Sequence, residues 1–317
     1  MEALADNLLS PVVLCFALGI FARLIHSDLS IPEPIYQGLS IYLLLAIGLK
    51  GGAALAVASP AELALPAAMT LLAGVLTPVS AFFIMRRFGR LDATDSAAVA
   101  AHYGSVSVVT FLAAGEAARR AGFAGEDFLP ALVAVLEVPG IIVALLFAGS
   151  QSAGSWKKAL HEVVTGKSIV LLAGGLVIGW LCGPARLVDV QPFFTTAFKG
   201  VLCLFMIELG LATGRRLRDL RHTGVRLVVL GCLLPVFHGV LGVAMGTLAG
   251  LSVGGAAVFG AMVGSASYIA APAAVRVALP KANPACYLTL ALGVTFPFNL
   301  AIGIPLYLKI ASLFQSS

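Results

Sequence analysis

The amino-acid sequence predicts an all-α polytopic membrane protein, with ten transmembrane helices arranged as a 5+5 inverted repeat in which helices 4 and 9 are broken. Three observations favour this fold class. Of all residues, 60% are hydrophobic and 11% are charged, with a mean hydropathy of +1.01, whereas a soluble domain carries roughly 25% charged residues. Apolar stretches close to the roughly 20 residues of a spanning helix recur along the chain. Landmarks of the first half of the chain also recur in the second half.

Each half of the chain contains five candidate spans. They cover about residues 8–25, 36–57, 63–86, 94–118, 127–149, 167–183, 193–213, 224–249, 253–278 and 284–312. We expect Thr94 or Asp95 to cap the fourth span. Glu2 and Asp6 make the amino terminus acidic and the first apolar run is a full span, so no removable signal peptide is expected. The five cysteines have no paired spacing, so we predict no disulfide, metal cluster or bound cofactor.

The two halves share glycines and prolines at nearly constant spacing. The matched pairs are Pro78 with Pro235, Gly104 with Gly264, and Pro139 with Pro297, which lie 157, 160 and 158 positions apart. Five spans are an odd number, so the second half must enter the membrane inverted. We therefore divide the chain into a first repeat at residues 1–150 (helices 1–5), a cytoplasmic linker at 151–166, and a second repeat at 167–317 (helices 6–10).

One motif occurs in the middle of two spans at matched positions. It reads Gly104-Ser105-Val106-Ser107 in the fourth span and Gly264-Ser265-Ala266-Ser267 in the ninth. Glycine and serine weaken a helix interior, and a broken helix survives in a membrane only inside protein or beside a polar cavity. A single copy of the motif would indicate only a place where two membrane helices pack closely. Two matched copies of an inverted repeat favour a binding site near the membrane midplane.

The chemistry of the two motifs indicates an anion. The second half of each broken helix would begin at the break, and a helix N-terminus carries about half a positive charge and several unpaired N–H groups. Two facing N-termini can therefore bind an anion without any lysine or arginine. The serine hydroxyls both donate and accept hydrogen bonds, which suits a small oxyanion that retains a proton.

Lysines and arginines are concentrated in the loops that follow helices 1, 3, 5, 7 and 9. The largest groups lie at 86–90, 157–167 and 215–226. By the positive-inside rule these loops are cytoplasmic, and both termini lie on the opposite, periplasmic side. The net charge of +5 is explained by these loops, so no nucleic-acid partner is expected. Lys50, between Gly48-Leu49 and Gly51-Gly52, is expected to extend toward the outer membrane interface.

The motifs carry a family resemblance along essentially the whole chain. The matching segments are Tyr103-Gly104-Ser105-Val106-Ser107, Gly264-Ser265-Ala266-Ser267-Tyr268-Ile269-Ala270-Ala271-Pro272, Gly48-Leu49-Lys50-Gly51-Gly52 and Phe296-Pro297-Phe298-Asn299. They resemble the sodium-dependent bicarbonate transporters of the SbtA family. The resemblance implies a homotrimeric symporter of the bacterial inner (plasma) membrane that imports bicarbonate with sodium and holds the anion at the two broken helices.

The resemblance also implies a division of labour among the helices and a regulatory partner. Helices 1, 2, 6 and 7 would form a gate or scaffold domain, and helices 3–5 and 8–10 a moving core. Cyanobacterial members have a longer cytoplasmic segment between the halves and are regulated by a small nucleotide-binding protein of the PII type. The linker at 151–166 is short, which disfavours a PII-like partner for this chain.

Sodium requires oxygen ligands, and four residues near the breaks offer them. These are Asn299 and Thr295, beside Pro297, together with Thr110 and Glu137. Glu137 is an ionisable group inside a span, which by default suggests a functional role. We therefore predict a sodium site drawn from these four residues, the serines of the breaks and freed backbone carbonyls.

Three other functions compete with bicarbonate symport, of which the third, a purely regulatory or sensing membrane protein, would need an output domain for which both termini are too short. The first is a secondary transporter of the same architecture for another small anion, such as a short carboxylate. The second is an intramembrane enzyme, with Ser105 as nucleophile and His102 or His238 as base. His102 lies three positions before Ser105, but Met262 takes that position before Ser265. The repeat therefore argues against a nucleophile and base pair, and we predict that the chain is not an enzyme. His102 is instead expected to serve packing through a hydrogen bond.

Overall fold

The computed structural model describes residues 8–147, 155–217, 219 and 223–315. In these ranges the chain is helical and contains no strand. Seven helical stretches are long and apolar enough to cross a membrane: Glu33–Leu55, Pro60–Gly89, Ala93–Arg120, Leu129–Leu146, Lys167–Arg186, Val225–Leu248 and Pro284–Gln315. Two shorter helices, Pro11–Leu24 and Val253–Val263, are also apolar. The chain is therefore a polytopic membrane protein, while the total of ten spans stays a prediction.

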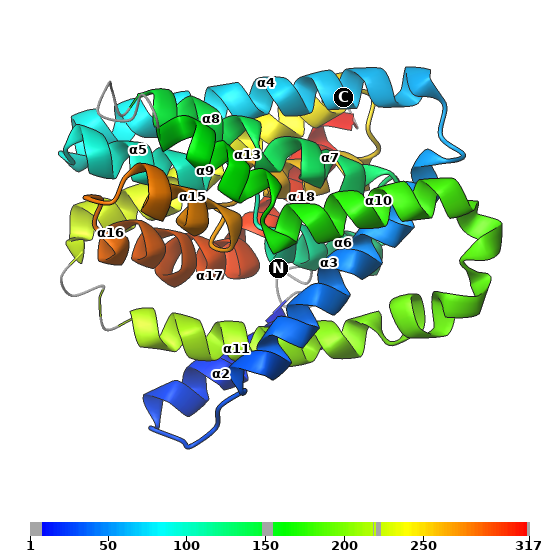
Figure 1. Ribbon diagram of the computed structural model, residues 1–317, viewed down its shortest axis with the longest axis horizontal. Coiled ribbons are helices and arrows are strands. Elements are labelled where there is room, and N and C mark those ends of the chain that lie inside the picture. The colour runs from blue at the N-terminus through cyan, green and yellow to red at the C-terminus, as the bar shows by residue number, and fades with distance from the viewer. Residues whose placement is uncertain (1–7, 148–154, 218, 220–222, 316–317) are drawn as a thin grey trace.

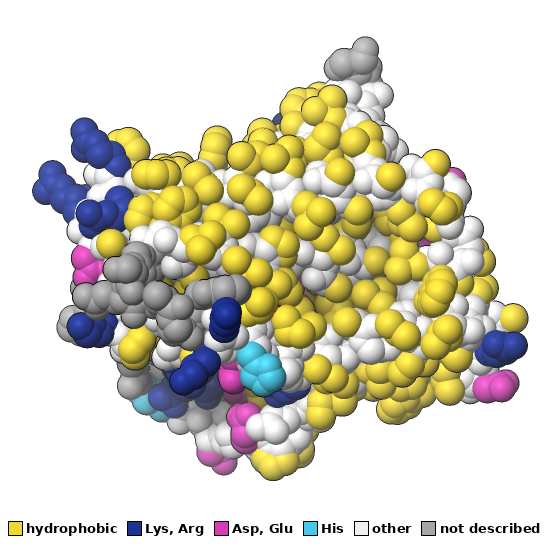
Figure 2. Space-filling model, turned by 45° about the horizontal axis from the view of Figure 1, so that its top comes forward, with side chains coloured by type: hydrophobic (Ala, Val, Ile, Leu, Met, Phe, Trp, Pro, Cys, Tyr) yellow, Lys and Arg dark blue, Asp and Glu magenta, His cyan; other side chains and the backbone are white. Residues whose placement is uncertain are grey.

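The surface agrees with a lipid environment. Figure 2 shows hydrophobic side chains over most of the visible face, with lysine and arginine side chains gathered mainly at one end. Large apolar residues such as Phe83, Trp180 and Leu233 are more than half exposed. In water such a surface would be an interaction site, but on a membrane-spanning bundle it faces the acyl chains.

Within residues 8–147, the first half of the chain forms seven α-helices and one short π-helix. In order they are α2 (Pro11–Leu24), α3 (Glu33–Leu55), α4 (Pro60–Ile84), which continues as the π-helix η1 (Met85–Gly89), α5 (Ala93–Tyr103), α6 (Val108–Arg120), α7 (Leu129–Glu137) and α8 (Pro139–Leu146). Asp92 caps α5 by accepting a hydrogen bond from Asp95 N at 2.7 Å. The expectation that Thr94 or Asp95 caps this helix was wrong, because the helix begins one residue earlier than predicted.

The second half contains further interruptions. Its described elements are α10 (Lys167–Arg186), the 3₁₀-helix η3 (Val188–Val190), the π-helix η4 (Pro192–Thr196), α11 (Phe198–Arg216), α13 (Val225–Leu248), α14 (Val253–Val263), α15 (Ala270–Ala278), α16 (Pro284–Leu288), the π-helix η5 (Thr289–Thr295), α17 (Phe296–Phe298), the π-helix η6 (Asn299–Gly303) and α18 (Ile304–Gln315). The last predicted span is therefore not one regular α-helix. Pro297 lies between its two π-helical stretches, where its ring and missing N–H disturb the α-helical hydrogen bonds.

Part of the predicted linker at 151–166 is itself a helix. This helix is α9 (Ser155–Val164), and it packs against α15. Val163 is buried while Lys157 and Lys158 are exposed, so one side of α9 covers the protein and the other is polar. Residues 151–154 lie outside the described part of the chain.

Four helices cross one another closely through glycines. α3 packs against α10, and α2 packs against α11. A Cβ atom added to Gly48 would lie 2.8 Å from Gly175 Cα, and one added to Gly19 would lie 2.9 Å from Gly210 Cα. These glycines let the backbones touch, as in other membrane helix pairs. In Figure 1, α2 and α11 lie along the bottom of the molecule, and α3 rises diagonally from them toward α10.

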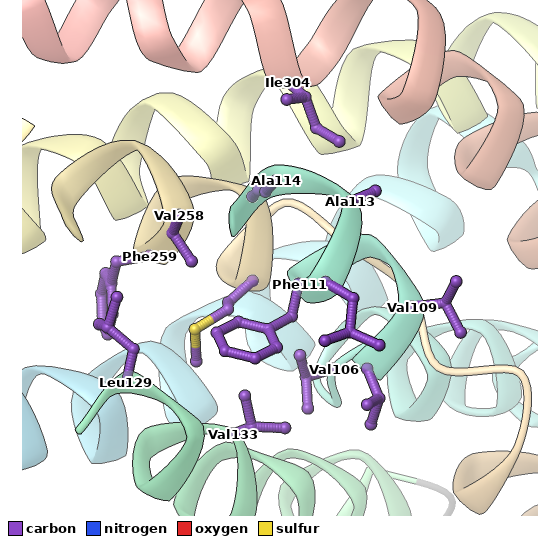
Figure 3. Packing of buried hydrophobic residues seen from close by; sticks show 14 of the residues in the cluster. Val106, Val109, Phe111, Ala113, Ala114, Leu129, Val133, Val258, Phe259 and Ile304 are labelled. Carbon is purple, nitrogen blue, oxygen red and sulfur yellow. The ribbon is translucent and has the colours of Figure 1, made fainter. Parts of the chain in front are cut away.

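The two interrupted stretches α5–α6 and α14–α15 occupy the interior. The most apolar window of Ala93–Arg120 is entirely buried, and Ala97, Ala98 and Ala100 have no exposed surface. Small side chains let α5 be surrounded by other helices. Figure 3 shows the same interior at Val106 and Phe111, which pack among side chains of α7 and α14. The non-helical backbone of both stretches is thus enclosed by protein, as a membrane requires.

Candidate functional site

The first break separates α5 from α6 over residues 104–107. Gly104 ends α5, and Ser107 caps α6 by accepting a hydrogen bond from Thr110 N at 3.1 Å. A Cβ on Gly104 would lie 2.7 Å from Pro78 Cβ and 3.0 Å from Gly140 Cα. Only glycine therefore fits where α4 and α8 press on the end of α5.

The second break separates α14 from α15 and is longer. α14 ends at Gly264 and α15 begins at Ala270, and Ile269 at its start makes no side-chain capping bond. A Cβ on Gly264 would lie 2.7 Å from Pro235 O and 2.9 Å from Gly239 Cα. In both breaks, therefore, the glycine packs against the proline of the preceding long helix, Pro78 in α4 or Pro235 in α13.

The two breaks lie side by side and are hydrogen-bonded to each other. Ser107 N donates to Ser265 Oγ at 2.8 Å, and Ser267 N donates to His102 O at 2.8 Å. Ser265 Oγ in turn donates to Met262 O at 2.8 Å. The structure therefore brings the Gly-Ser-x-Ser motifs together, although they are about half the chain apart in sequence. All eight residues of the two motifs are buried.

The positive ends of two helices lie at this junction. Both α6 and α15 begin at a break, and the first N–H groups of a helix have no acceptor within it. In α6, Thr110 N is bonded to the Ser107 cap, which leaves the amides of Val108 and Val109 as first-turn donors. In α15, Ala271 N has only a long bond of 3.4 Å to Ser267 Oγ. The junction thus offers backbone donors and serine hydroxyls, and no lysine or arginine belongs to either motif.

Thr295 joins the first break to α13. Its Oγ1 donates to Gly231 O at 2.8 Å, so it accepts the hydrogen bond from Tyr103 OH at 2.5 Å. Tyr103 is the last residue of α5, directly before Gly104. The hydroxyl oxygen of Thr295 is therefore engaged on both sides and fixes the end of α5.

Asn299 holds the second break. Its Nδ2 donates to Gly264 O at 2.9 Å, and its Oδ1 lies 2.9 Å from Tyr307 OH. The same hydroxyl lies 2.7 Å from Pro235 O, so one proton is shared between two acceptors. Thr295 and Asn299 are four positions apart on the irregular helix 289–303, and that one segment therefore contacts both breaks.

The other two residues predicted for sodium are placed differently. Thr110 and Glu137 are each 1% exposed. Thr110 Oγ1 and Glu137 Oε2 have no hydrogen-bond partner among the described residues. Both flank the first break, because Thr110 lies in the first turn of α6 and Glu137 O accepts a bond from Ser105 Oγ at 3.2 Å. Among the four predicted ligands, Thr110 Oγ1 and Glu137 Oε2 are the oxygen atoms that make no hydrogen bond within the described residues, and the sodium site stays a prediction.

Two buried histidines lie near the junction. His102 Nδ1 lies 2.7 Å from Ala98 O, and since a carbonyl can only accept, this nitrogen carries the proton. The ring packs against Tyr287 at 4.6 Å between centroids. His238 Nε2 lies 2.7 Å from Ser80 Oγ and joins α13 to α4. Both rings pack in the helix bundle, as expected for His102.

Sequence reasoning missed the tyrosines that hold the breaks. Tyr103 stands directly before the first motif, a position that could have suggested a supporting role. Tyr307 lies eight positions after Asn299 and has no comparable signal. The pair Ser80 and His238 is 158 positions apart, close to the spacing of the repeat, which is the one clue to their contact.

Two interrupted helices that meet in the interior of a helical membrane protein are typical of secondary transporters. Comparison with known families agrees with this class. The family described as the Na+-dependent bicarbonate transporter superfamily matches residues 11–312, and the chain belongs to that superfamily. A search of the curated proteins found no match. Family membership implies a transporter rather than an enzyme, with bicarbonate as the solute and sodium as the coupling ion.

Proposed function

We propose that the chain is a sodium-coupled symporter that imports bicarbonate and holds the anion where the two breaks meet. The observation that carries the proposal is the direct bonding of the breaks, from Ser107 N to Ser265 Oγ and from Ser267 N to His102 O, each at 2.8 Å. This junction combines two helix N-termini with serine hydroxyls. Bicarbonate offers three oxygens as acceptors and one hydroxyl as a donor, which matches that combination.

The bond between Ser107 N and Ser265 Oγ also suggests how binding would proceed. An anion would take over the Ser107 amide, and the lone pair thus freed on Ser265 Oγ, whose proton is donated to Met262 O, would accept a hydrogen bond from the bicarbonate hydroxyl. Binding would thus exchange one internal hydrogen bond for bonds to a charged acceptor, which are roughly twice as strong as neutral ones. The absence of lysine or arginine from both motifs keeps the attraction moderate, so that the anion can be released.

For sodium we propose a site beside the first break that uses Glu137 and Thr110. Their buried, unpartnered oxygens are of the kind that hard cations prefer. Asn299 and Thr295, the other two predicted ligands, would then act by holding the breaks in place. A tenfold sodium gradient stores about 1.4 kcal/mol per ion, enough for a tenfold accumulation of bicarbonate at one-to-one coupling.

The 5+5 inverted repeat is the architecture that we propose for this mechanism. It is supported by the reciprocal packing of α3 on α10 and of α2 on α11, where the first helix of each half meets the second helix of the other. We propose that these four helices form the scaffold and that the remaining spans form the moving core. A homotrimer in the bacterial inner membrane, with periplasmic termini, belongs to the same proposal and rests on the resemblance and the loop charges.

The decisive test is uptake of radiolabelled bicarbonate into proteoliposomes that contain the purified protein. Sodium outside should drive accumulation, and replacing it with potassium should abolish accumulation. Empty liposomes serve as the control for passive exchange of carbon dioxide. If well-folded protein shows no sodium-dependent uptake, bicarbonate is the wrong substrate, and short carboxylates such as acetate would be measured next in the same vesicles.

A further inference from the structure

A cavity of about 730 Å³ opens at one end of the helix bundle, apart from the Gly-Ser-x-Ser motifs. One wall is formed by α3 and the connection between α10 and α11, and the other by α6 and the segment that leads into α7. Residues of three connections reach its mouth, including Val57, Asp127 and Val188. These connections follow helices 2, 4 and 6 of the predicted topology, so the loop charges place the mouth on the outer side of the membrane.

The cavity wall carries three cations, and two of them are paired. Lys199 Nζ lies 2.8 Å from Glu116 Oε1, and Arg119 Nη2 lies 2.7 Å from Glu116 Oε2. Lys50, the third cation, takes part in none of the salt bridges found among the described residues. It lies within electrostatic reach of Arg119, which repels it, and of Asp127, which attracts it.

Two carboxylates also line the cavity, Glu126 and the exposed Asp127. Glu126 Oε1 accepts a hydrogen bond from Ser252 N at 2.6 Å, at the start of α14. The negative charge of Glu126 is therefore directed at a helix N-terminus. Of the three lining cations, Lys50 is therefore the one that makes no salt bridge among the described residues, and Asp127 acts on it only through space.

The floor of the cavity is apolar and close to the first break. Phe111, Leu129 and Val258 line it, and Phe111 lies one helical turn after Ser107 in α6. Figure 3 shows the Phe111 ring beside Val106, the third residue of the first motif. The cavity thus runs from a charged mouth toward the place where the breaks meet, and apolar side chains separate the two.

We propose that this cavity is the outer vestibule of the transport path and that Lys50 attracts a small monovalent oxyanion into it before the anion reaches the breaks. The inference rests on the proposed function and adds one residue, Lys50, that determines how readily the anion enters the cavity. A cation held beside low-dielectric walls raises the local concentration of anions and their rate of association. Lys50 would thus act on capture and leave the later translocation step unchanged.

The test compares initial rates of bicarbonate uptake by Lys50→Gln, Lys50→Arg and Lys309→Gln. Lys309 is an exposed lysine that does not line the cavity, so its variant is matched for loss of charge. We expect Lys50→Gln to raise the KM for bicarbonate about threefold to tenfold at an unchanged maximal rate and to flatten the dependence of kcat/KM on ionic strength. Lys50→Arg and Lys309→Gln should behave as wild type. A Lys50→Gln variant indistinguishable from Lys309→Gln would overturn the inference.

A chemical rescue guards against a folding effect. Lys50→Cys should show the raised KM. Treatment with aminoethyl methanethiosulfonate, which attaches a positive charge to the cysteine, should bring the KM back to the wild-type value. The negatively charged sulfoethyl reagent should raise the KM further, and treated wild-type protein controls for the native cysteines. If both reagents change the KM alike, charge is not the cause and the inference fails. Absence of sodium-dependent uptake in wild type would instead reject the proposed function, so the two failures can be told apart.

Discussion

The first break is short and capped from within, whereas the second is longer and is held by other helices. Ser107 caps α6 through its own side chain, while α15 starts without a side-chain cap at Ile269. The second break depends instead on Asn299, which binds Gly264 O. The same four-letter motif therefore interrupts both helices, but the surrounding helices decide how firmly each interruption is held.

This difference suggests separate tasks for the two breaks. Thr295 of the helix 289–303 holds Tyr103 at the end of α5, but the first turn of α6 is capped by Ser107 itself and does not need that helix to keep its donors in place. A break that relies on a contact from the helix 289–303 can respond when that helix moves. We expect the first break to be the fixed part of the anion site and the second to be the part that adjusts.

The largest effect should come from filling either glycine. Gly104→Leu and Gly264→Leu would each place a side chain where a single Cβ already meets its neighbours at 2.7 Å. Both should reduce sodium-dependent uptake at least about a hundredfold, in line with the cost of overpacking a close contact. Gly174→Leu is the matched control, because nothing lies within 4 Å of a Cβ at Gly174. Wild-type uptake in one of the two variants would show that its break is dispensable.

A tenfold effect should follow from removing the support of the second break. Asn299→Ala leaves Gly264 O without its partner, and an unsatisfied buried carbonyl costs about 1 to 3 kcal/mol. We expect the maximal uptake rate to fall about tenfold while the sodium concentration for half-maximal uptake stays constant. Asn283→Ala, which removes the exposed cap of α16, is the control. A raised sodium requirement at an unchanged maximal rate would make Asn299 a sodium ligand instead.

The smallest effect should be a difference in stability between the alanine variants of Ser107 and Ser267, the serines that precede the second half-helices. Ser107→Ala removes a helix cap and should cost about 1 kcal/mol of stability, seen as a lower Tm in detergent. Ser267→Ala loses only the 3.4 Å bond to Ala271 N and should leave the Tm nearly unchanged. Ser10→Ala, which removes the cap of α2, gives the size of an ordinary capping loss. Equal losses at Ser107 and Ser267 would remove the distinction between the breaks.

Much of the fold could be predicted because its signals are local. Glycine and serine in the middle of an apolar span indicate a break wherever they occur, and the predicted span 253–278 agrees with α14 and α15. The meeting of Ser107 with Ser265 could not be computed from either motif alone. It followed only from the assumption that matched positions of two repeats lie together.

The contacts that hold the two breaks could not be predicted from the local sequence. Asn299 was predicted for sodium because an amide oxygen beside a proline suggests a ligand, and that role stays a prediction; the bonds of its side chain to Gly264 O and Tyr307 OH had no signal in the sequence. Such bonds depend on how helices far apart in sequence are rotated toward each other. The helix α9 was missed for a similar reason. Its polar sequence resembles a loop, and only the packing of its buried side against α15 shows that it is a helix.

The glycine crossings of α2 with α11 and of α3 with α10 have a mechanical consequence. Helices that touch backbone to backbone have no side-chain layer between them that could deform. Because Gly19, Gly48, Gly175 and Gly210 leave no slack, these pairs should behave as a stiff frame. Any displacement that carries a solute across the bilayer must then occur along the boundary of that frame, where longer side chains can slide and change rotamer.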